Sequence, residues 1–158
     1  MPDIVTKDFV VEKADIDVLG HVNNQVYVRW MEQAAAEASN VNGWPTERYF
    51  ELGAVWVARQ HWVEYLRPCI EGDVVTVYTW VEARDAYRSL RRFAMKKGDK
   101  LCCVAATEWN FIDLKTRRAH VCPPEVGDCF TCVPADDPRL IEAGVARSLR
   151  YAPRKYEA

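Results

Sequence analysis

The sequence predicts a single α+β domain in which an antiparallel sheet curls around one long helix. Three observations support this prediction. One segment before residue 43 has apolar residues at helical spacing, four segments after Gly53 are rich in strand-forming residues, and only short polar breaks separate those four. Because short breaks suit antiparallel neighbours, we expect sequential pairing rather than helical crossovers.

The first half of the chain contains one expected strand and two expected helices. Residues 5–12 alternate loosely and predict a strand. Residues 27–41 carry apolar side chains with period 3.6 and predict the long helix. Asn23 or Asn24 suits its N-cap, and Gly43 before Pro45 suits its end. Residues 45–52 are expected to form a short second helix.

The second half is dominated by strand patterns. Val, Trp, Tyr, Thr and Phe recur in the segments that we expect to be strands, namely residues 54–66, 74–83, 89–97 and 101–113. Residues 118–122 suggest a final short strand. We expect a domain over residues 1–133 and a polar C-terminal extension over residues 134–158, a surface appendage with a short helix between about 136 and 149.

Length and composition narrow the classes of function. A chain of 158 residues suits one domain, and 49% hydrophobic with 28% charged residues is ordinary for a globular protein. A formal net charge of −2 argues against nucleic-acid binding, which normally needs a basic excess. No apolar run is long enough to span a membrane and no secretory signal is visible, so we expect a cytoplasmic protein without membrane insertion.

The six cysteines are expected to be mostly reduced thiols. Cys129 and Cys132 are spaced like half of a zinc knuckle or a redox pair, but no second pair follows at metal spacing. His61 and His120 also lack acidic or cysteine partners at metal spacing. We therefore expect no metal site.

A polar segment just ahead of the long helix carries the residues most suited to chemistry. It contains Asp15, Asp17, Gly20, His21 and the Asn23–Asn24 pair. Amide groups at a helix start lack internal partners and that end is electropositive, so it could polarise an acyl carbonyl. A nearby carboxylate could then attack the carbonyl or activate water.

These residue types also have an ordinary structural role. Asp and Asn before a helix commonly cap it, glycine commonly forms a turn, and a lone histidine commonly serves as a hydrogen-bonding partner. The residues by themselves leave capping and catalysis both open.

The same segment resembles the signature of the 4-hydroxybenzoyl-CoA thioesterase-type hotdog family. The matching residues are Asp17, Gly20, His21, Val22, Asn23, Asn24, Tyr27, Trp30 and Glu32. The segment is also similar to that of plant acyl-carrier-protein thioesterases. A turn at residues 65–68, followed by Gly72 and Asp73, is a further match. The resemblance covers about residues 5–123 and implies a hotdog fold, with the sheet wrapped around the central helix.

The resemblance assigns roles to individual residues. It implies that Asp17, rather than Asp15, is the catalytic aspartate, and that the Asn24 backbone N–H contacts the thioester carbonyl. His21 matches a catalytic histidine proposed for the plant enzymes, although a purely structural role is an open alternative. Leu19 and Pro68 replace two functional residues of the plant pattern, which favours a mechanism with one carboxylate. Whether Asp17 is nucleophile or general base is open.

Other residues are expected to contact the substrate. These are Gly20, Asn23, Tyr27 and Glu32 of the matching segment, with packing in the helix as the alternative for Glu32, and the basic residues Arg88 and Arg91. Arginines could pair with the phosphates of coenzyme A, although a solvated sheet face explains the basic cluster equally well. Period-two geometry separates Arg91 from Arg92, so both cannot face one ligand.

The expected function is hydrolysis of an acyl-CoA or acyl-carrier-protein thioester. No cofactor is expected beyond coenzyme A as part of the substrate. The resemblance implies a homodimer or a dimer of dimers, with active sites between subunits. Two alternatives are a hotdog hydratase or dehydratase acting on a thioester-linked chain, and a non-catalytic acyl-CoA-binding module in which Asp17 is only a cap.

Overall fold

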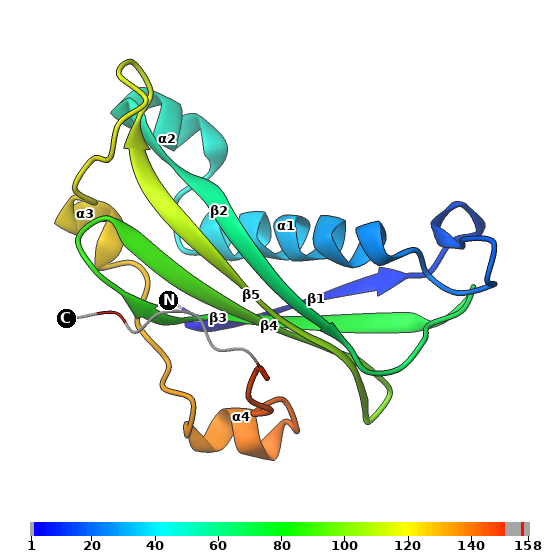
Figure 1. Ribbon diagram of the computed structural model, residues 1–158. Helices are drawn as coiled ribbons and strands as arrows, with labels where there is room; N and C mark the ends of the chain where they lie inside the picture. The colour runs from blue at the N-terminus through cyan, green and yellow to red at the C-terminus, as the bar shows by residue number, and fades with distance from the viewer. Residues whose placement is uncertain (1, 151–155, 157–158) are drawn as a thin grey trace.

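The computed structural model describes residues 2–150 and residue 156. Its elements follow the predicted order of strand, helices and strands (Figure 1). They are β1 (Ile4–Val10), the short 3-10 turn η1 (Lys13–Asp15), α1 (Asn24–Val41), α2 (Thr46–Leu52), β2 (Ala54–Tyr65), β3 (Val74–Arg84), β4 (Arg88–Lys97), β5 (Lys100–Asp113), α3 (Pro124–Gly127) and α4 (Pro138–Glu142).

The five strands form one antiparallel sheet in the order β1-β3-β4-β5-β2. The sheet curves around α1, which lies along one of its faces (Figure 1). This confirms the α+β prediction. β2 and β1 are the two edge strands, and a bulge between Ala58 and Gln60 interrupts the register of β2 with β5.

The expectation of strictly sequential pairing was wrong at one connection. β2 does not pair with β3, because β4 and β5 lie between them. Three strand spacings amount to about 14 Å, which the link 66–73 spans. The link is anchored below the start of α1, where the Val22 N–H donates to the Cys69 carbonyl over 2.9 Å. A short polar segment therefore serves here as a crossover rather than as a hairpin turn.

The main core lies between α1 and the sheet. Tyr27, Trp30 and Met31 point from α1 toward Val77, Phe93 and other buried residues of β3, β4 and β5. Ala34, Ala35 and Ala38 are also buried, and their small side chains let the helix backbone approach the strands. The apolar stripe that predicted the helix is the surface that buries it.

Both ends of α1 have the expected signals. The Asn23 side chain accepts a 3.0 Å hydrogen bond from the Gln25 N–H, so Asn23 is the N-cap. At the other end, Gly43 has φ +89°, a left-handed conformation that favours glycine and reverses the chain.

The C-terminal segment covers the other face of the sheet, below it in Figure 1. Val133, Leu140, Val145 and Leu149 are buried against outer-face residues that include Trp80. The prediction of a surface appendage was therefore wrong, because a mostly polar segment carries enough spaced apolar side chains to complete a second core.

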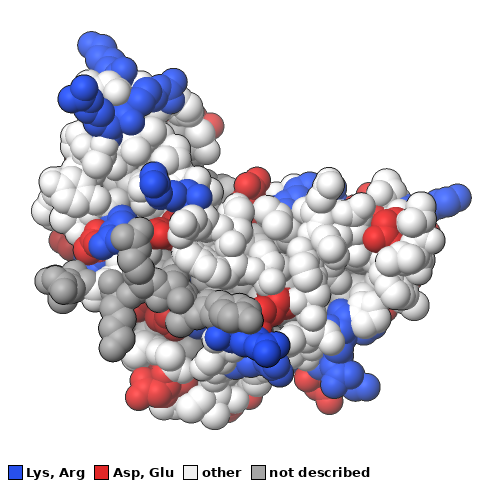
Figure 2. Space-filling model, in the orientation of Figure 1, with Lys and Arg blue, Asp and Glu red and all other residues white. Residues whose placement is uncertain are grey.

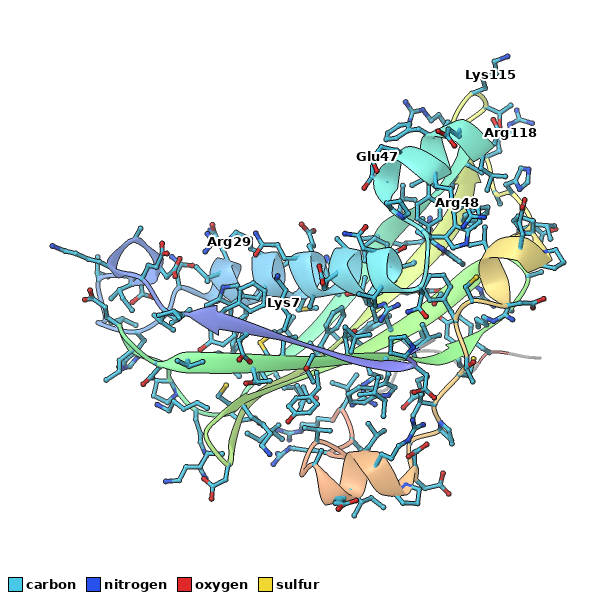
Figure 3. All side chains as sticks on the ribbon, turned by 180° about the vertical axis from the view of Figure 1, so that it is seen from behind. Lys7, Arg29, Glu47, Arg48, Lys115 and Arg118 are labelled. Carbon is cyan, nitrogen blue, oxygen red and sulfur yellow. The ribbon has the colours of Figure 1, made fainter. Side chains whose placement is uncertain are left out.

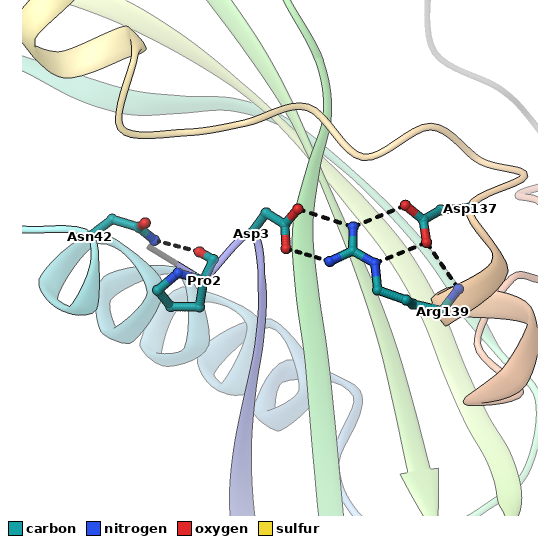
Figure 4. A network of polar contacts seen from close by, with 5 residues as sticks. All are labelled: Pro2, Asp3, Asn42, Asp137 and Arg139. Carbon is teal, nitrogen blue, oxygen red and sulfur yellow. Dashed lines mark hydrogen bonds and ion pairs between the residues drawn. The ribbon is translucent and has the colours of Figure 1, made fainter.

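An ion-pair network holds the same segment to the N-terminus (Figure 4). The Arg139 guanidinium lies 2.8 Å from one oxygen of Asp3 and 3.0 Å from the other, and it also pairs with Asp137 at 2.9 Å. Close by, the Asn42 side chain donates to the Pro2 carbonyl over 3.1 Å. The start of the chain thus lies between the C-terminal segment and the C-terminal end of α1.

Three smaller differences separate prediction and structure. Residues 118–122 form no strand, only an isolated bridge between Ile112 and Ala119. α3 was not predicted, and α4 is much shorter than the expected helix. Among the helices described, none is long and apolar enough to cross a membrane.

Candidate functional site

Asp17 lies in a tight loop that the backbone closes just before α1. The Asp17 N–H donates to the His21 carbonyl over 2.9 Å, and the Gly20 N–H donates to the Asp17 carbonyl over 3.0 Å. Gly20 has φ +80°, which this reversal needs. One carboxylate oxygen of Asp17 accepts from the Leu19 N–H over 2.8 Å. Within the described part of the chain, the other oxygen has no partner, so it is available to a substrate or water.

Asp15 has a different environment from Asp17. It is 5% exposed and lies 2.6 Å from the Arg29 guanidinium, while its other oxygen accepts from the Glu12 N–H over 2.9 Å. Burial raises the pKa of the Asp15 carboxyl, but the Glu12 amide and Arg29 outweigh this and hold it below its usual value. Asp15 fixes the loop against α1, whose Arg29 is labelled in Figure 3.

The start of α1 presents one amide without a partner. The Asn23 N–H donates to the Asp15 carbonyl over 2.8 Å, and the Gln25 and Val26 amides donate to Asn23. The Asn24 N–H makes no hydrogen bond to any described group, and Asn24 is exposed. A free, electropositive amide at a helix start is suited to stabilise an oxyanion.

Two tyrosines, Tyr27 and Tyr65, pack together at the start of α1. The Tyr65 hydroxyl donates to the Asn24 carbonyl over 3.0 Å, tying the end of β2 to α1. Tyr27 is 3% exposed and packs edge-on against Tyr65, with ring centroids 5.1 Å apart. Burial and the neighbouring Cys69 thiol raise the pKa of Tyr27 well above its usual value. The expected substrate contact of Tyr27 is not favoured, because the core encloses its side chain.

The remaining residues of the matching segment lie at the surface. His21 is exposed in the loop that contains Asp17. Glu32 is also exposed, but eight residues into α1, about 12 Å along the helix axis from Asn24. The loop thus brings Asp17, Gly20, His21, Asn23 and Asn24 into one neighbourhood, and Glu32 lies farther along.

The structure does not bring Arg88 and Arg91 together. They are three residues apart on β4, so their side chains lie on opposite faces of the sheet. Arg88 pairs with Asp85 at 2.6 Å on the outer side. Arg91 is buried on the face that carries α1, and Arg92 pairs with Glu82 at 3.1 Å on the outer face. The predicted separation of Arg91 from Arg92 is confirmed.

A cavity of about 190 Å³ lies between the C-terminal half of α1 and the sheet. Its walls are mainly aromatic and apolar, and its lining includes Glu32, Ser39, Tyr49, Trp56, Arg91 and Trp109. No sequence signal pointed to it, because its residues come from α1, α2, four of the five strands and the segment around α3.

His61 lies in β2, within the segment that was expected to be a strand. It lies near the middle of β2, and its Nδ1 is 2.8 Å from the Thr107 hydroxyl. Its ring therefore lies on the face that carries α1, on the edge strand between Tyr65 and the cavity.

Among the described residues, no group of three or more His, Cys, Asp or Glu side chains is placed so that it could hold a metal ion. The six cysteines are free, and Cys129 donates to the Glu125 carbonyl over 3.3 Å.

The candidate site consists of a carboxylate with one free oxygen, a free amide at a helix start and an exposed histidine. Such a set can activate water and stabilise the oxyanion of an acyl-transfer reaction.

Comparison with known proteins bears on the family and the fold of the chain. A family model described as the thioesterase-like superfamily matches residues 11–130. No curated protein sequence matches the chain. Among solved structures, a 1,4-dihydroxy-2-naphthoyl-CoA thioesterase from Synechocystis aligns with TM-score 0.74 and 17% identity, over 80% of this chain and 94% of that one.

Two further solved structures extend the likeness. A gentisyl-coenzyme A thioesterase aligns with TM-score 0.74 and 16% identity, over 80% of this chain and all of that one (100%). A Staphylococcus aureus protein solved in complex with CoA aligns with TM-score 0.76 and 17% identity, over 98% and 95% of the two chains. The resemblance seen in the pre-helix segment and the hotdog fold that it implied are confirmed. This chain belongs to the thioesterase-like superfamily.

Proposed function

We propose that this protein hydrolyses an acyl thioester of coenzyme A, with Asp17 as the catalytic carboxylate. The observation that carries the proposal is the free Asn24 amide at the start of α1, in the neighbourhood of an aspartate with one free oxygen. A thioester carbonyl that accepts from this amide would be polarised toward attack, and the developing oxyanion would be stabilised there.

Two routes from this geometry give the same products. As a general base, Asp17 takes a proton from water while the water oxygen adds to the carbonyl carbon. As a nucleophile, its carboxylate adds directly, forming a mixed anhydride that water then opens. In both, the carbon–sulfur bond breaks, the sulfur leaves as thiolate and is protonated, and the acyl group becomes a free acid. We assign His21 to orienting the attacking water.

A second copy of the chain would complete the substrate site. β2 is an edge strand, and its central residues 57–61 are exposed. Antiparallel pairing of two β2 strands about this stretch would place Tyr65 and the helix start of one copy opposite the Ala54 end of the other. The outer sheet face is already covered by the C-terminal segment, so we propose a homodimer through β2.

The same dimer would supply cations for coenzyme A. The turn after β5 carries the exposed residues Lys115, Arg117 and Arg118. Basic side chains gather at this end of the molecule in Figure 2, and Figure 3 shows Lys115 and Arg118 at the tip beyond α2. This tip lies near the Ala54 end of β2, and therefore near the partner's helix start. The complex of the Staphylococcus aureus relative with CoA supports coenzyme A as carrier.

The test is thiol release from short, long, branched and aryl acyl-CoA thioesters. We expect turnover of at least one class, above the rate in buffer. Tight binding of acyl-CoA without thiol release would instead identify a binding module. Addition of water to an enoyl-CoA without thiol release would identify a hydratase.

Labelled water separates the two routes. In a single turnover in oxygen-18 water, a general base delivers labelled oxygen to the acid at once. A nucleophilic Asp17 delivers its own unlabelled oxygen when water attacks the Asp17 carbonyl of the anhydride. Mass analysis of the first-turnover acid and of the Asp17 peptide reads out which route operates.

A further inference from the structure

Arg91 is a buried cation in the lining of a largely apolar cavity. It is 7% exposed. Its one hydrogen bond within the described residues is 3.1 Å long, from Nη1 to the Thr79 hydroxyl, whose own proton is donated to the Arg92 carbonyl. The Phe130 ring centroid lies 6.0 Å from the guanidinium carbon. No carboxylate among the described residues lies within ion-pair distance of Arg91.

This arrangement leaves most donors of the guanidinium unused. An arginine has five N–H donors, and charges are rarely buried without a partner. Burial lowers the pKa of Arg91 to about 10, which still leaves the guanidinium charged at neutral pH. Such a side chain costs stability unless an anion joins it.

The other polar groups of the lining point to the same ligand chemistry. The Trp109 indole N–H is enclosed and has no acceptor in the described structure. Arg84, the second cation of the lining, already pairs with Asp128 at 3.7 Å. Glu32 is the one acidic residue of the lining, and it is exposed on α1. The lining thus contains a buried guanidinium without an anionic partner and an indole N–H without an acceptor, between aromatic walls.

We propose that this cavity receives the acyl group of the substrate, and that Arg91 binds a carboxylate at the end of that group remote from the thioester. The inference rests on the proposed thioesterase function and names its substrate class, an acyl-CoA whose chain or ring ends in a carboxylate. Arg91 is then the residue that determines specificity.

The cavity can be reached from a helix start. Within one chain, the Glu32 side of the cavity lies about 12 Å along α1 from Asn24. In the proposed dimer, the partner's helix start lies beside the Val55 and Trp56 wall of the same cavity. In both cases the thioester stays at the helix start while the acyl group extends toward Arg91.

The first experiment tests the cavity without catalysis. Calorimetric titration compares a medium-chain fatty acid anion with its methyl ester, which has the same chain, one additional methyl group and no charge. We expect the anion to bind the native protein at least about 10-fold more tightly, the scale of one charge-assisted hydrogen bond. Arg91→Met should bind both alike, whereas Lys100→Met, which removes an exposed cation at the start of β5, should retain the preference.

The second experiment tests specificity in turnover. Matched acyl-CoA pairs of increasing length end in a carboxylate or in a methyl group. We expect the carboxylate-ended member of at least one pair to have a kcat/KM about 10-fold higher or more, and Arg91→Met to remove this advantage while keeping turnover of the methyl-ended member. Equal kcat/KM in the native protein, or a preference that survives in Arg91→Met, would overturn the inference.

The two experiments separate the two proposals. Anion binding that depends on Arg91 but no cleavage of any thioester would overturn the thioesterase function and leave an anion-binding cavity. Cleavage of thioesters with no dependence on Arg91 would overturn the cavity assignment and leave the function standing. Circular dichroism and Tm of Arg91→Met confirm that the variant is folded in either case.

Discussion

Asp15 and Asp17 lie two residues apart and differ in what surrounds them. Asp15 has partners for both oxygens, a buried position and a lowered pKa, so its charge serves the fold. Asp17 is half-buried, and one of its carboxylate oxygens accepts a hydrogen bond from the Leu19 N–H within the same turn. Sequence spacing does not separate these two environments, because both aspartates precede the same helix. The family resemblance favoured Asp17 as the catalytic aspartate. The contacts of Asp15 give a physical reason for this preference, because both of its oxygens already have partners.

The charge of Asp15 should stabilise the fold in a pH-dependent way. Because its pKa is lowered on folding, its contribution is present above the usual value near 4 and is lost as the pH falls through the folded-state pKa. We expect Asp15→Asn to lower Tm by about 2–4 °C at neutral pH, which corresponds to about 1 kcal/mol. Thermal unfolding between pH 7 and pH 3 measures this.

A matched control accompanies that measurement. Asp136 is exposed, so Asp136→Asn should leave Tm unchanged at every pH. An Asp15→Asn deficit that stays constant down to pH 3 would contradict the assignment of a stabilising charge.

At the scale of elements, the cap of α1 joins stability to the candidate site. Asn23 holds the Gln25 amide, which leaves the Asn24 amide as the free donor. We expect Asn23→Ala to lower the free energy of unfolding by about 1 kcal/mol, the usual cost of a lost cap, and Asn23→Asp to preserve it. Urea unfolding measures both, and equal stability of the two variants would show that the cap does not contribute.

The individual elements were largely predictable from the sequence. The period of 3.6 residues that predicted α1 is a direct consequence of burying one face of the helix. The pairing of β2 was not predictable in this way, because a short link can either turn back or pass under a helix. The cavity was not predictable from the sequence either. Arg91 becomes a candidate ligand-binding residue only when its burial and its lack of an ionic partner are known.

At the scale of the whole molecule, the C-terminal segment belongs to the fold. Its apolar residues are too widely spaced to predict a second core, and their burial depends on the outer face of the sheet. We expect Leu140→Ala, at a position 1% exposed, to cost about 2–4 kcal/mol of unfolding free energy. Ile141→Ala, at a position 61% exposed, should cost less than about 0.5 kcal/mol.

Chemical unfolding distinguishes these two neighbours. Similar small losses for both substitutions would mean that the segment lies on the sheet without stabilising it. A large loss for Leu140→Ala alone would establish it as part of the cooperative domain.

The basic residues of the turn after β5, Lys115, Arg117 and Arg118, allow a functional test of the proposed dimer. Arg118→Glu should raise KM for acyl-CoA by about 10-fold, because a phosphate contact becomes a repulsion. It should leave KM unchanged for the corresponding acyl-pantetheine thioester, which lacks the nucleotide. Gel filtration with light scattering verifies that the variant keeps the oligomeric state of the native protein. An equal rise in KM for both substrates would contradict a phosphate role.

Asp17→Asn removes the proposed catalytic carboxylate and changes little else in the candidate site. The asparagine oxygen can still accept from the Leu19 N–H, so the loop is kept while the charge is removed. With an acyl-CoA that the native protein cleaves, we predict thiol release about 10²-fold slower or more, at an unchanged Tm. Near-native thiol release by Asp17→Asn would exclude Asp17 as the catalytic carboxylate and place the chemistry on another residue.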